Sequence, residues 1–328
     1  MIMLATLVRW DWFKLVRRWI PWILLVILLL LSQLTVWGNY FQYQNLQRSG
    51  GSVTVGTGGS QRDVNCNDVL ASNLAKLPPG TNAQILQGLQ ADCSQIATTV
   101  PHQLRQLYDG FTLPGSIPNC LGTTISIGLI LFAILTASVF GAEYGWGTVR
   151  PTLIRGTGRG PYLAAKLLLL ALLAAGALVL VVGATAISSV VAKGVVANAV
   201  SGTSTTWSHA AVLLGRTWLV LLPYLVFVAF VTVLTRSSAS GMAIGVGYYL
   251  GEQIVVAILG GIFTWFHSIG NYLLGENIAT FSGVGVFGGH AAVSGLHAFL
   301  VLLAYTLVFG SVTFAVFRTR DVTGVNAS

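Results

Sequence analysis

Long apolar runs alternate with short polar connections along most of the chain. Six runs are long enough to cross a bilayer, because a transmembrane helix needs about 20 consecutive apolar residues. These runs lie at 19–38, 119–141, 162–191, 211–234, 241–264 and 294–317. The pattern therefore predicts an all-α, polytopic membrane protein with six transmembrane helices.

Composition and the placement of charge support this prediction and give it an orientation. The chain is 54% hydrophobic and 8% charged, whereas soluble domains carry roughly 25% charged residues. With the N-terminus inside, eleven of the 17 Lys and Arg residues are cytoplasmic, five are external and Arg216 lies within a span. The eleven are Arg9, Lys14, Arg17, Arg18, Arg150, Arg155, Arg159, Lys166, Arg236, Arg318 and Arg320, and the five are Arg48, Arg62, Lys76, Arg105 and Lys193. The positive-inside rule thus predicts that both termini are cytoplasmic.

The two ends of the chain are expected on the inner side of the membrane. Residues 1–18 alternate apolar and basic positions, which favours a helix lying in the inner interface, in contact with membrane lipid. The alternative is a cytosolic extension of the first span. The run at 19–38 could be mistaken for a signal peptide, but its length and the lack of an A-x-A-like cleavage site favour a retained span. Residues 318–328 are predicted to be a cytoplasmic tail.

Residues 39–118 form the largest polar block and are predicted to be a small helical domain outside the membrane. The stretch RSGGSVTVGTGGSQR is typical of a flexible linker. Two stretches with helical spacing follow, separated by LPPG. Cys66 and Cys93 lie on the oxidising side, where a disulfide would stabilise a thin core; the alternative is two free thiols. Cys120 is expected to be an unpaired packing residue, although its pairing with either of the others is also open.

A second outer segment, 265–293, is too apolar for a solvated loop and too interrupted for a span. Its glycines and its aromatic start fit a pair of short re-entrant or interfacial helices. Irregular backbone of this kind is tolerated at membrane depth only when protein or a wet cavity covers it.

The stretch 141–160 is the most distinctive connection on the predicted cytoplasmic side. Its GTGRG resembles a phosphate loop, but the lysine and the preceding strand of a P-loop are missing. Residues 143–155 can instead form a short helix with an apolar tip and basic surroundings, suited to docking into a soluble partner. The alternative is an ordinary loop whose arginines only fix the topology.

The sequence GAEYGWGTVRPTLIRGTGRGPYLAAKLL resembles the cytoplasmic connection of type 2 ABC-transporter permeases. In that family an E-x-x-x-G-T motif leaves the second span, a basic turn follows, and an (R/S)-x-x-y-l-x-x-K-l stretch enters the third. The matching residues are Glu143, Gly147, Thr148, Arg155, Arg159, Tyr162 and Lys166. The six-span layout, the start WDWFKLVRRW and the closing FAVFRTRDVT extend the resemblance over nearly the whole length. Asp11, where Glu is more usual, and a longer outer loop with cysteines depart from the family.

The resemblance implies a permease subunit in a bacterial plasma membrane. Such a subunit pairs with a second copy or a sister permease and with two ABC ATPase subunits, which bind ATP and Mg; no cofactor is expected on this chain. The segment 143–155 would be the coupling helix. Its ATPase-coupling residues would be Glu143, Gly147, Thr148, Arg150, Leu153, Arg155 and Arg159. Export is the expected direction, because no feature for docking an external receptor is evident.

Two charged residues within the spans are candidates for a translocation path. Glu252 lies about 11 residues into the fifth run, roughly 16 Å deep, where an unpaired charge is costly. It is either a substrate- or cation-contacting group or a hydrogen-bonded packing residue. Arg216 could pair with it, although Arg216 lies nearer the outer surface. A series of small residues in the same run permits close helix packing; it consists of Gly241, Gly245, Gly247 and Gly251.

Other functions find less support in the sequence. The chain has no H-E-x-x-H pair and no G-x-S-x-G elbow, so an intramembrane enzyme is not expected. Its histidines lack metal-ligand spacing, so no metal site is expected either. The net charge of +8 follows from topology and does not indicate nucleic-acid binding. The remaining alternative is a non-transporting membrane sensor or anchor whose outer loop binds a ligand. The substrate is not specified by the sequence.

Overall fold

The computed structural model describes residues 2–49, 52–57, 60–66, 83–145, 158–196, 205–283 and 293–319. The chain divides into two compact units. Unit 1 comprises Met1–Gln33, Ile117–Thr185 and Trp207–Ser328, and unit 2 comprises Leu34–Ser116 and Ala186–Thr206. The predicted coupling segment therefore falls within unit 1.

The described residues are helical except for one pair of strands. The helices are α1 (Ile2–Val16), α2 (Trp19–Ser49), α4 (Ala83–Phe111), α5 (Ser116–Ser126), α6 (Gly128–Gly145), α8 (Arg159–Val195), α9 (Trp207–Thr235), α10 (Ser238–Ile262), α11 (Phe266–Gly270), α12 (Leu274–Ser282) and α13 (Gly295–Thr319). The strands are β1 (Ser52–Thr57) and β2 (Ser60–Asn65). The prediction of a predominantly helical fold is confirmed.

Five helices in the described part of the chain are long and apolar enough to cross a membrane, or six if a bent pair counts as one span. The five are α2, α8, α9, α10 and α13, and the pair is α5 with α6, which meet at 47°. The predicted second span is thus a broken helix. Its break lies at a Ser–Ile–Gly sequence, where the Ser126 hydroxyl donates to the Gly122 carbonyl at 2.6 Å. Such back-bonding and a following glycine both favour a bend.

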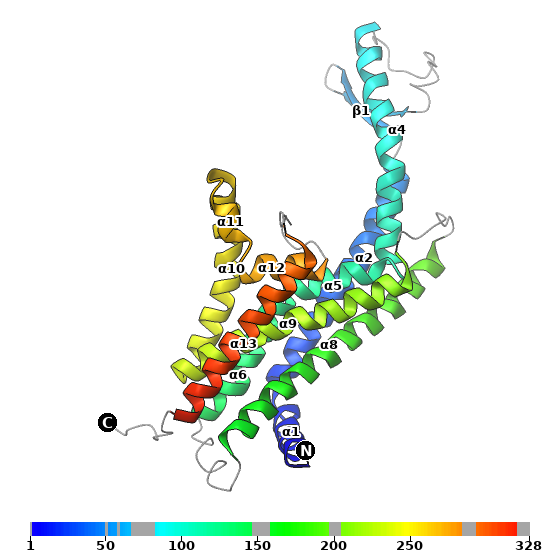
Figure 1. Ribbon diagram of the computed structural model, residues 1–328. Coiled ribbons are helices and arrows are strands. Elements are labelled where there is room, and N and C mark those ends of the chain that lie inside the picture. The colour runs from blue at the N-terminus through cyan, green and yellow to red at the C-terminus, as the bar shows by residue number, and fades with distance from the viewer. Residues whose placement is uncertain are drawn as a thin grey trace. The chain divides into compact units, whose positions relative to one another are not determined.

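The centre of unit 1 is built from α6, α9, α10 and α13, which pack side by side (Figure 1). Two glycines one turn apart on α10 allow this close contact. A Cβ at Gly245 would lie 3.3 Å from Ala133 of α6, and one at Gly241 would lie 3.1 Å from Ala137. The other two glycines of the predicted series, Gly247 and Gly251, have nothing within 4 Å. Only half of that series therefore serves packing in unit 1.

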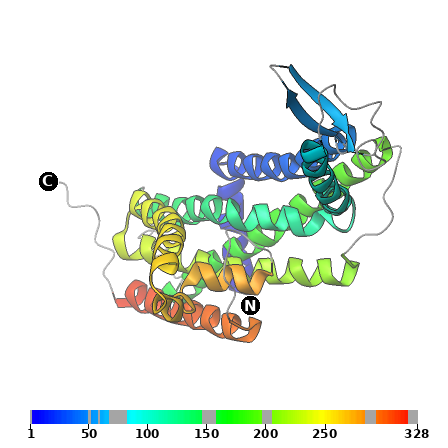
Figure 2. The same cartoon turned by 90° about the horizontal axis from the view of Figure 1, so that it is seen from above.

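The described part of the segment between α10 and α13 contains two short helices, α11 and α12. α12 packs against α13 and α9 (Figure 2). It ends at Gly283, whose φ of 69° lies in the left-handed region that favours glycine. The part of this segment at 284–292 lies outside the described residues.

Unit 2 corrects one prediction. Residues 48–62 were expected to be a flexible linker, whereas the strands β1 and β2 form here and pair antiparallel, Ser52 with Asn65 and Thr57 with Ser60. A disulfide joins Cys66, directly after β2, to Cys93 on α4, and both residues are buried. The core is an aromatic cluster of Tyr40, Tyr43, Tyr108 and Phe111 with Val36 and Ala192. The predicted helix within 67–77 lies outside the described residues.

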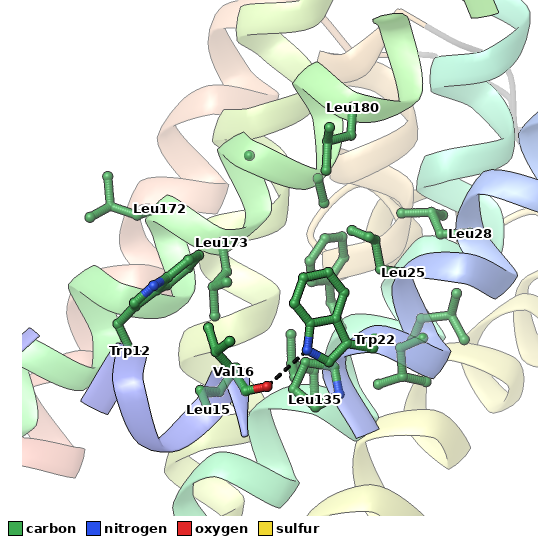
Figure 3. Close-up of a pocket in the computed structure, with 16 residues that line it drawn as sticks. Trp12, Leu15, Val16, Trp22, Leu25, Leu28, Leu135, Leu172, Leu173 and Leu180 are labelled. Atoms are coloured by element: carbon green, nitrogen blue, oxygen red, sulfur yellow. Dashed lines mark hydrogen bonds between the residues drawn. The ribbon is translucent and has the colours of Figure 1, made fainter. Parts of the chain in front are cut away.

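The N-terminal helices of unit 1 enclose an apolar groove of about 180 Å³ (Figure 3). Trp12 of α1 and Trp22 of α2 lie on its rim, with Leu173 and Leu180 of α8 along its wall. The Trp22 indole donates to the carbonyl of Val16, the last residue of α1, at 2.9 Å. This bond satisfies a helix-end carbonyl and fixes the turn between α1 and α2. That α1 lies in the membrane interface remains a prediction.

Candidate functional site

Three helix ends lie close to the predicted coupling loop along the chain or in space, and the segment 146–157 of that loop lies outside the described residues. They are the C-terminal end of α6, the N-terminal end of α8 and the C-terminal end of α13, which lie at one end of unit 1 (Figure 1). α8 begins with Arg-Gly-Pro, and proline is tolerated in the first turn because its missing N–H has no partner there. The first bond of the helix runs from the Tyr162 amide to the Gly158 carbonyl at 3.2 Å.

An ion pair joins α6 to α8 at this end. Lys166 Nζ lies 2.9 Å from Glu143 Oε1, and the two side chains are only 3% and 7% exposed. The same ammonium lies 3.5 Å from the Val139 carbonyl, one helical turn before Glu143. Both charges are therefore withdrawn from solvent and depend on each other. Removing one partner of such a pair costs about 3–5 kcal/mol, because the other charge stays buried alone.

Aromatic rings surround the buried ammonium. Lys166 Nζ lies 5.3 Å from the centre of the Tyr162 ring and 5.6 Å from that of Phe140. Tyr162 precedes Lys166 by one helical turn, which places both side chains on the same face of α8. Ring faces attract a cation more strongly when water is excluded, so these contacts hold Lys166 in its buried position.

α13 is attached to the same cluster by two contacts. The Tyr162 ring stacks on Phe317 with centres 5.8 Å apart and planes 10° from parallel. Arg159 Nη1 donates to the Arg318 carbonyl at 2.7 Å, one of the carbonyls that a helix end leaves without an intrahelical partner. We call Glu143, Arg159, Tyr162, Lys166 and Phe317 the loop-base cluster. It connects three helices at the base of the segment 146–157.

Four of the residues selected by their resemblance to the permease motif come together here: Glu143, Arg159, Tyr162 and Lys166. Glu143 lies in the last turn of α6, so residues 143–145 belong to α6 and not to a separate coupling helix. Arg159 opens α8. The other predicted coupling residues lie outside the described residues; they are Gly147, Thr148, Arg150, Leu153 and Arg155.

Glu252 forms a second buried polar site, in α10. Its Oε1 accepts hydrogen bonds from the amides of Gly275 at 2.7 Å and Glu276 at 3.2 Å, both in the first turn of α12. The N-cap residue of α12, Leu273, offers no side-chain hydrogen bond. Glu252 therefore caps α12 from a neighbouring helix and matches its positive end. A Cβ at position 275 would lie 3.0 Å from the carboxyl carbon, so a larger residue there would displace the Glu252 carboxyl group.

Arg216 of α9 lies near the opposite end of α12. Its guanidinium carbon is 5.7 Å from the centre of the Phe281 ring, and Nη1 is 3.9 Å from where a Cβ would stand at Gly283. Within the described residues no ion pair joins Arg216 to Glu252. A carboxylate thus lies at the positive end of α12 and a guanidinium near its negative end, the arrangement that complements a helix dipole.

Cys120, expected to be a packing residue, lies in the protein interior. Cys120 is buried and free, and its Sγ lies 3.1 Å from the Ile117 carbonyl. No group of His, Cys, Asp or Glu with the arrangement of a metal site occurs among the residues that the structure describes.

The spacing of the motif did not reveal that Lys166 pairs with Glu143. Glu143 pairs across the loop with a residue 23 positions later. A lysine at the fifth position of the apolar run 162–191 is itself a signal, because a charge there needs a partner on an adjacent helix.

Comparison with known proteins gives a family and no function. The model of the DUF2705 family, whose members are described as proteins of unknown function, matches residues 107–323, about two thirds of the chain. The match contains the whole loop-base cluster and Glu252. No curated protein and no solved structure matches the chain.

Proposed function

We propose that this chain, which belongs to the DUF2705 family of unknown function, is the transmembrane permease subunit of an ATP-driven exporter. The proposal is argued from the chain's own residues. Separate ATPase subunits would dock on the segment 143–159 and supply ATP and Mg. A second copy of the chain, or a sister permease, would complete the translocation path. The expected location is a bacterial plasma membrane, with both termini in the cytoplasm.

The loop-base cluster is the observation that carries this proposal. A transport ATPase must move several spans by acting on one short connection. Here the ends of that connection are tied together by the buried pair of Glu143 and Lys166, and α13 is held to them through Arg159 and Tyr162. A displacement of the segment would therefore be passed to α6, α8 and α13 together. Packed elements of this kind switch between discrete arrangements rather than deforming continuously.

The charge of the connection fits the proposed partner. Three arginines, Arg150, Arg155 and Arg159, follow one another within ten residues, with Leu153 between the first two. Such a surface suits an acidic groove with an apolar floor on a soluble subunit. Within this proposal Glu252 and Arg216 would contribute to the translocation path.

The proposal is tested with the chain co-purified with the ATPase subunits and reconstituted in proteoliposomes. We expect Arg155→Glu to lower transport-coupled ATP hydrolysis at least tenfold by placing like charges at the docking surface. Arg105→Glu is the matched control, since Arg105 is an exposed arginine of α4 in unit 2, and hydrolysis should stay within twofold of wild type.

One outcome would support the alternative of a sensor or anchor. If the chain isolated from native membranes carries no ATPase and retains full biological activity, it is not a permease subunit. Equal rates of ATP hydrolysis in the Arg155→Glu and wild-type complexes would show that the segment 143–159 does not couple ATP hydrolysis to transport.

A further inference from the structure

The carboxyl group of Glu252 is only half used by the capping of α12. Oε1 accepts both amide hydrogen bonds, while Oε2 is buried and has no hydrogen-bond partner of good geometry within the described residues. The whole residue is 7% exposed. A carboxyl oxygen without a well-aligned hydrogen bond at this depth is costly, and a cationic ligand would offset that cost.

Tyrosines surround this carboxyl group from three helices. Tyr248 lies one turn before Glu252 on α10, and its hydroxyl interacts with the carboxyl group. Tyr224 of α9 and Tyr305 of α13 also interact electrostatically with Glu252. The buried hydroxyl of Tyr249 has no hydrogen-bond partner in the described part of the chain. Aromatic faces next to a carboxylate are the chemistry that recognises organic cations.

The aromatic rings continue from Tyr248 to the surface of α13. The Tyr248 ring lies 5.0 Å from Phe227, Phe227 lies 5.2 Å from Phe309, and Phe309 lies 5.7 Å from Tyr305, measured between ring centres. Tyr305 and Phe309 in turn line a groove of about 570 Å³ along α13. That volume is within the range of about 300–1,000 Å³ typical of small-molecule sites.

The rest of the groove is apolar, with one polar end. Leu300, Val301 and Val308 form its wall, and Tyr272 and His297 its end. Tyr305 Oη donates to the Tyr272 backbone carbonyl at 3.0 Å and His297 Nε2 lies 3.1 Å from the Asn271 carbonyl, so the Tyr305 hydroxyl and the His297 ring are already engaged. A ligand for this groove is therefore mostly apolar.

The geometry points to a binding site for a lipophilic organic cation, which lies in the groove along α13 against Tyr305 and Phe309 and is attracted by the carboxylate of Glu252. Arg216, near the far end of the nine-residue helix α12, is roughly 14 Å along that helix from the end that Glu252 caps. The claim that such a cation is the exported substrate rests on the proposed function. The claim that it binds in this groove does not.

Binding of tetraphenylphosphonium to the purified chain in lipid nanodiscs tests the inference. Tetraphenylborate is a probe of the same shape and opposite charge, and empty nanodiscs give the background. We expect saturable binding of the cation and at least tenfold weaker binding of the anion. Equal affinity for the two probes would overturn the inference.

Two pairs of variants separate charge from ring contacts. Glu252→Gln should lower the affinity for the cation at least tenfold, while its amide oxygen can still accept the Gly275 and Glu276 amides, so α12 stays capped. Asp92→Asn, which removes a carboxylate from α4 in unit 2, should leave the affinity within twofold. Tyr305→Leu should weaken binding about tenfold through loss of the ring face, whereas Tyr305→Phe should stay within twofold.

A preference for the cation that survives Glu252→Gln would overturn the inference, and so would equal affinities of Tyr305→Leu and Tyr305→Phe. These measurements use no ATPase, so they decide on the site whether or not the chain exports anything. A cation that binds normally but is not moved by the ATPase-containing complex would count against the proposed function and leave the site in place.

Discussion

At the scale of single residues, two lysine ion pairs among the described residues of unit 1 differ in how far they are buried. Lys166 and Glu143 are 2.9 Å apart and nearly inaccessible. Lys14 and Asp11 are 3.7 Å apart, and the lysine side chain is 45% exposed while that of the aspartate is 10% exposed. Exposed pairs contribute about 0–1 kcal/mol, because water and salt screen them. Burial therefore decides which of the two pairs matters for stability.

We predict that Lys166→Met lowers the free energy of unfolding by about 3–5 kcal/mol, because Glu143 would remain buried without a partner. Lys14→Met is the comparison variant and should lower it less than Lys166→Met, because Lys14 is 45% exposed and water screens its pair with Asp11. Thermal unfolding of the chain in nanodiscs measures both. The double variant Glu143→Leu with Lys166→Met should recover most of the loss, and a double variant as unstable as Lys166→Met would contradict this account.

How well the role of a residue could be predicted from the sequence depended on how close to it in the chain its partners lie. Glu252 was predicted to be buried and either functional or hydrogen-bonded, because depth along an apolar run is visible in the sequence. Its partners are backbone amides of Gly275 and Glu276, which no residue type reveals. Lys166 was selected by resemblance alone, and its partner lies across a loop.

At the scale of helices and strands, the apolar runs predicted the spans well, because span length is set by bilayer thickness. The fifth run, expected at 241–264, is a helix at Ser238–Ile262. The break within the second span was not predicted, since Ser126 and Gly128 stand inside an unbroken apolar run. The antiparallel pairing of β1 with β2 was also missed. Val53 and Val55 alternate with polar residues before Gly-Gly, a pattern that favours a hairpin.

Close packing between helices predicts a difference between two glycines. A Cβ at Gly141 of α6 would overlap the backbone of Ser238 at the start of α10, whereas one at Gly247 would meet nothing within 4 Å. We expect Gly141→Ala to destabilise the chain by about 1–3 kcal/mol through overpacking. Gly247→Ala should be neutral or stabilising by up to about 1 kcal/mol, since alanine favours the helix. Thermal unfolding measures both, and equal melting temperatures would show that α6 and α10 are not packed this closely.

At the scale of the whole molecule, orientation in the membrane rests on the distribution of Lys and Arg. Charge counts can predict it because positive residues resist translocation. The packing within each of the two units could not be predicted in the same way, since contacts such as those of the aromatic cluster in unit 2 join residues far apart in the chain.

Cysteine labelling in intact cells tests the orientation. In a Cys120→Ser background, we expect Asp92→Cys to react with a membrane-impermeant maleimide, because the loop 39–118 is predicted to be external. Leu153→Cys should react only after the cells are made permeable. Labelling of Leu153→Cys from outside intact cells would reverse the predicted topology and, with it, the docking of cytoplasmic ATPase subunits.

The burial of Glu143 and Lys166 also restricts how the two positions can evolve. A single replacement at either one passes through an intermediate with a lone charge in the protein interior, which selection against unstable proteins disfavours. Substitutions at these positions should therefore be correlated among DUF2705 proteins, with both charges kept, both exchanged or both replaced by apolar residues. Independent variation would mean that the pair is dispensable in the family.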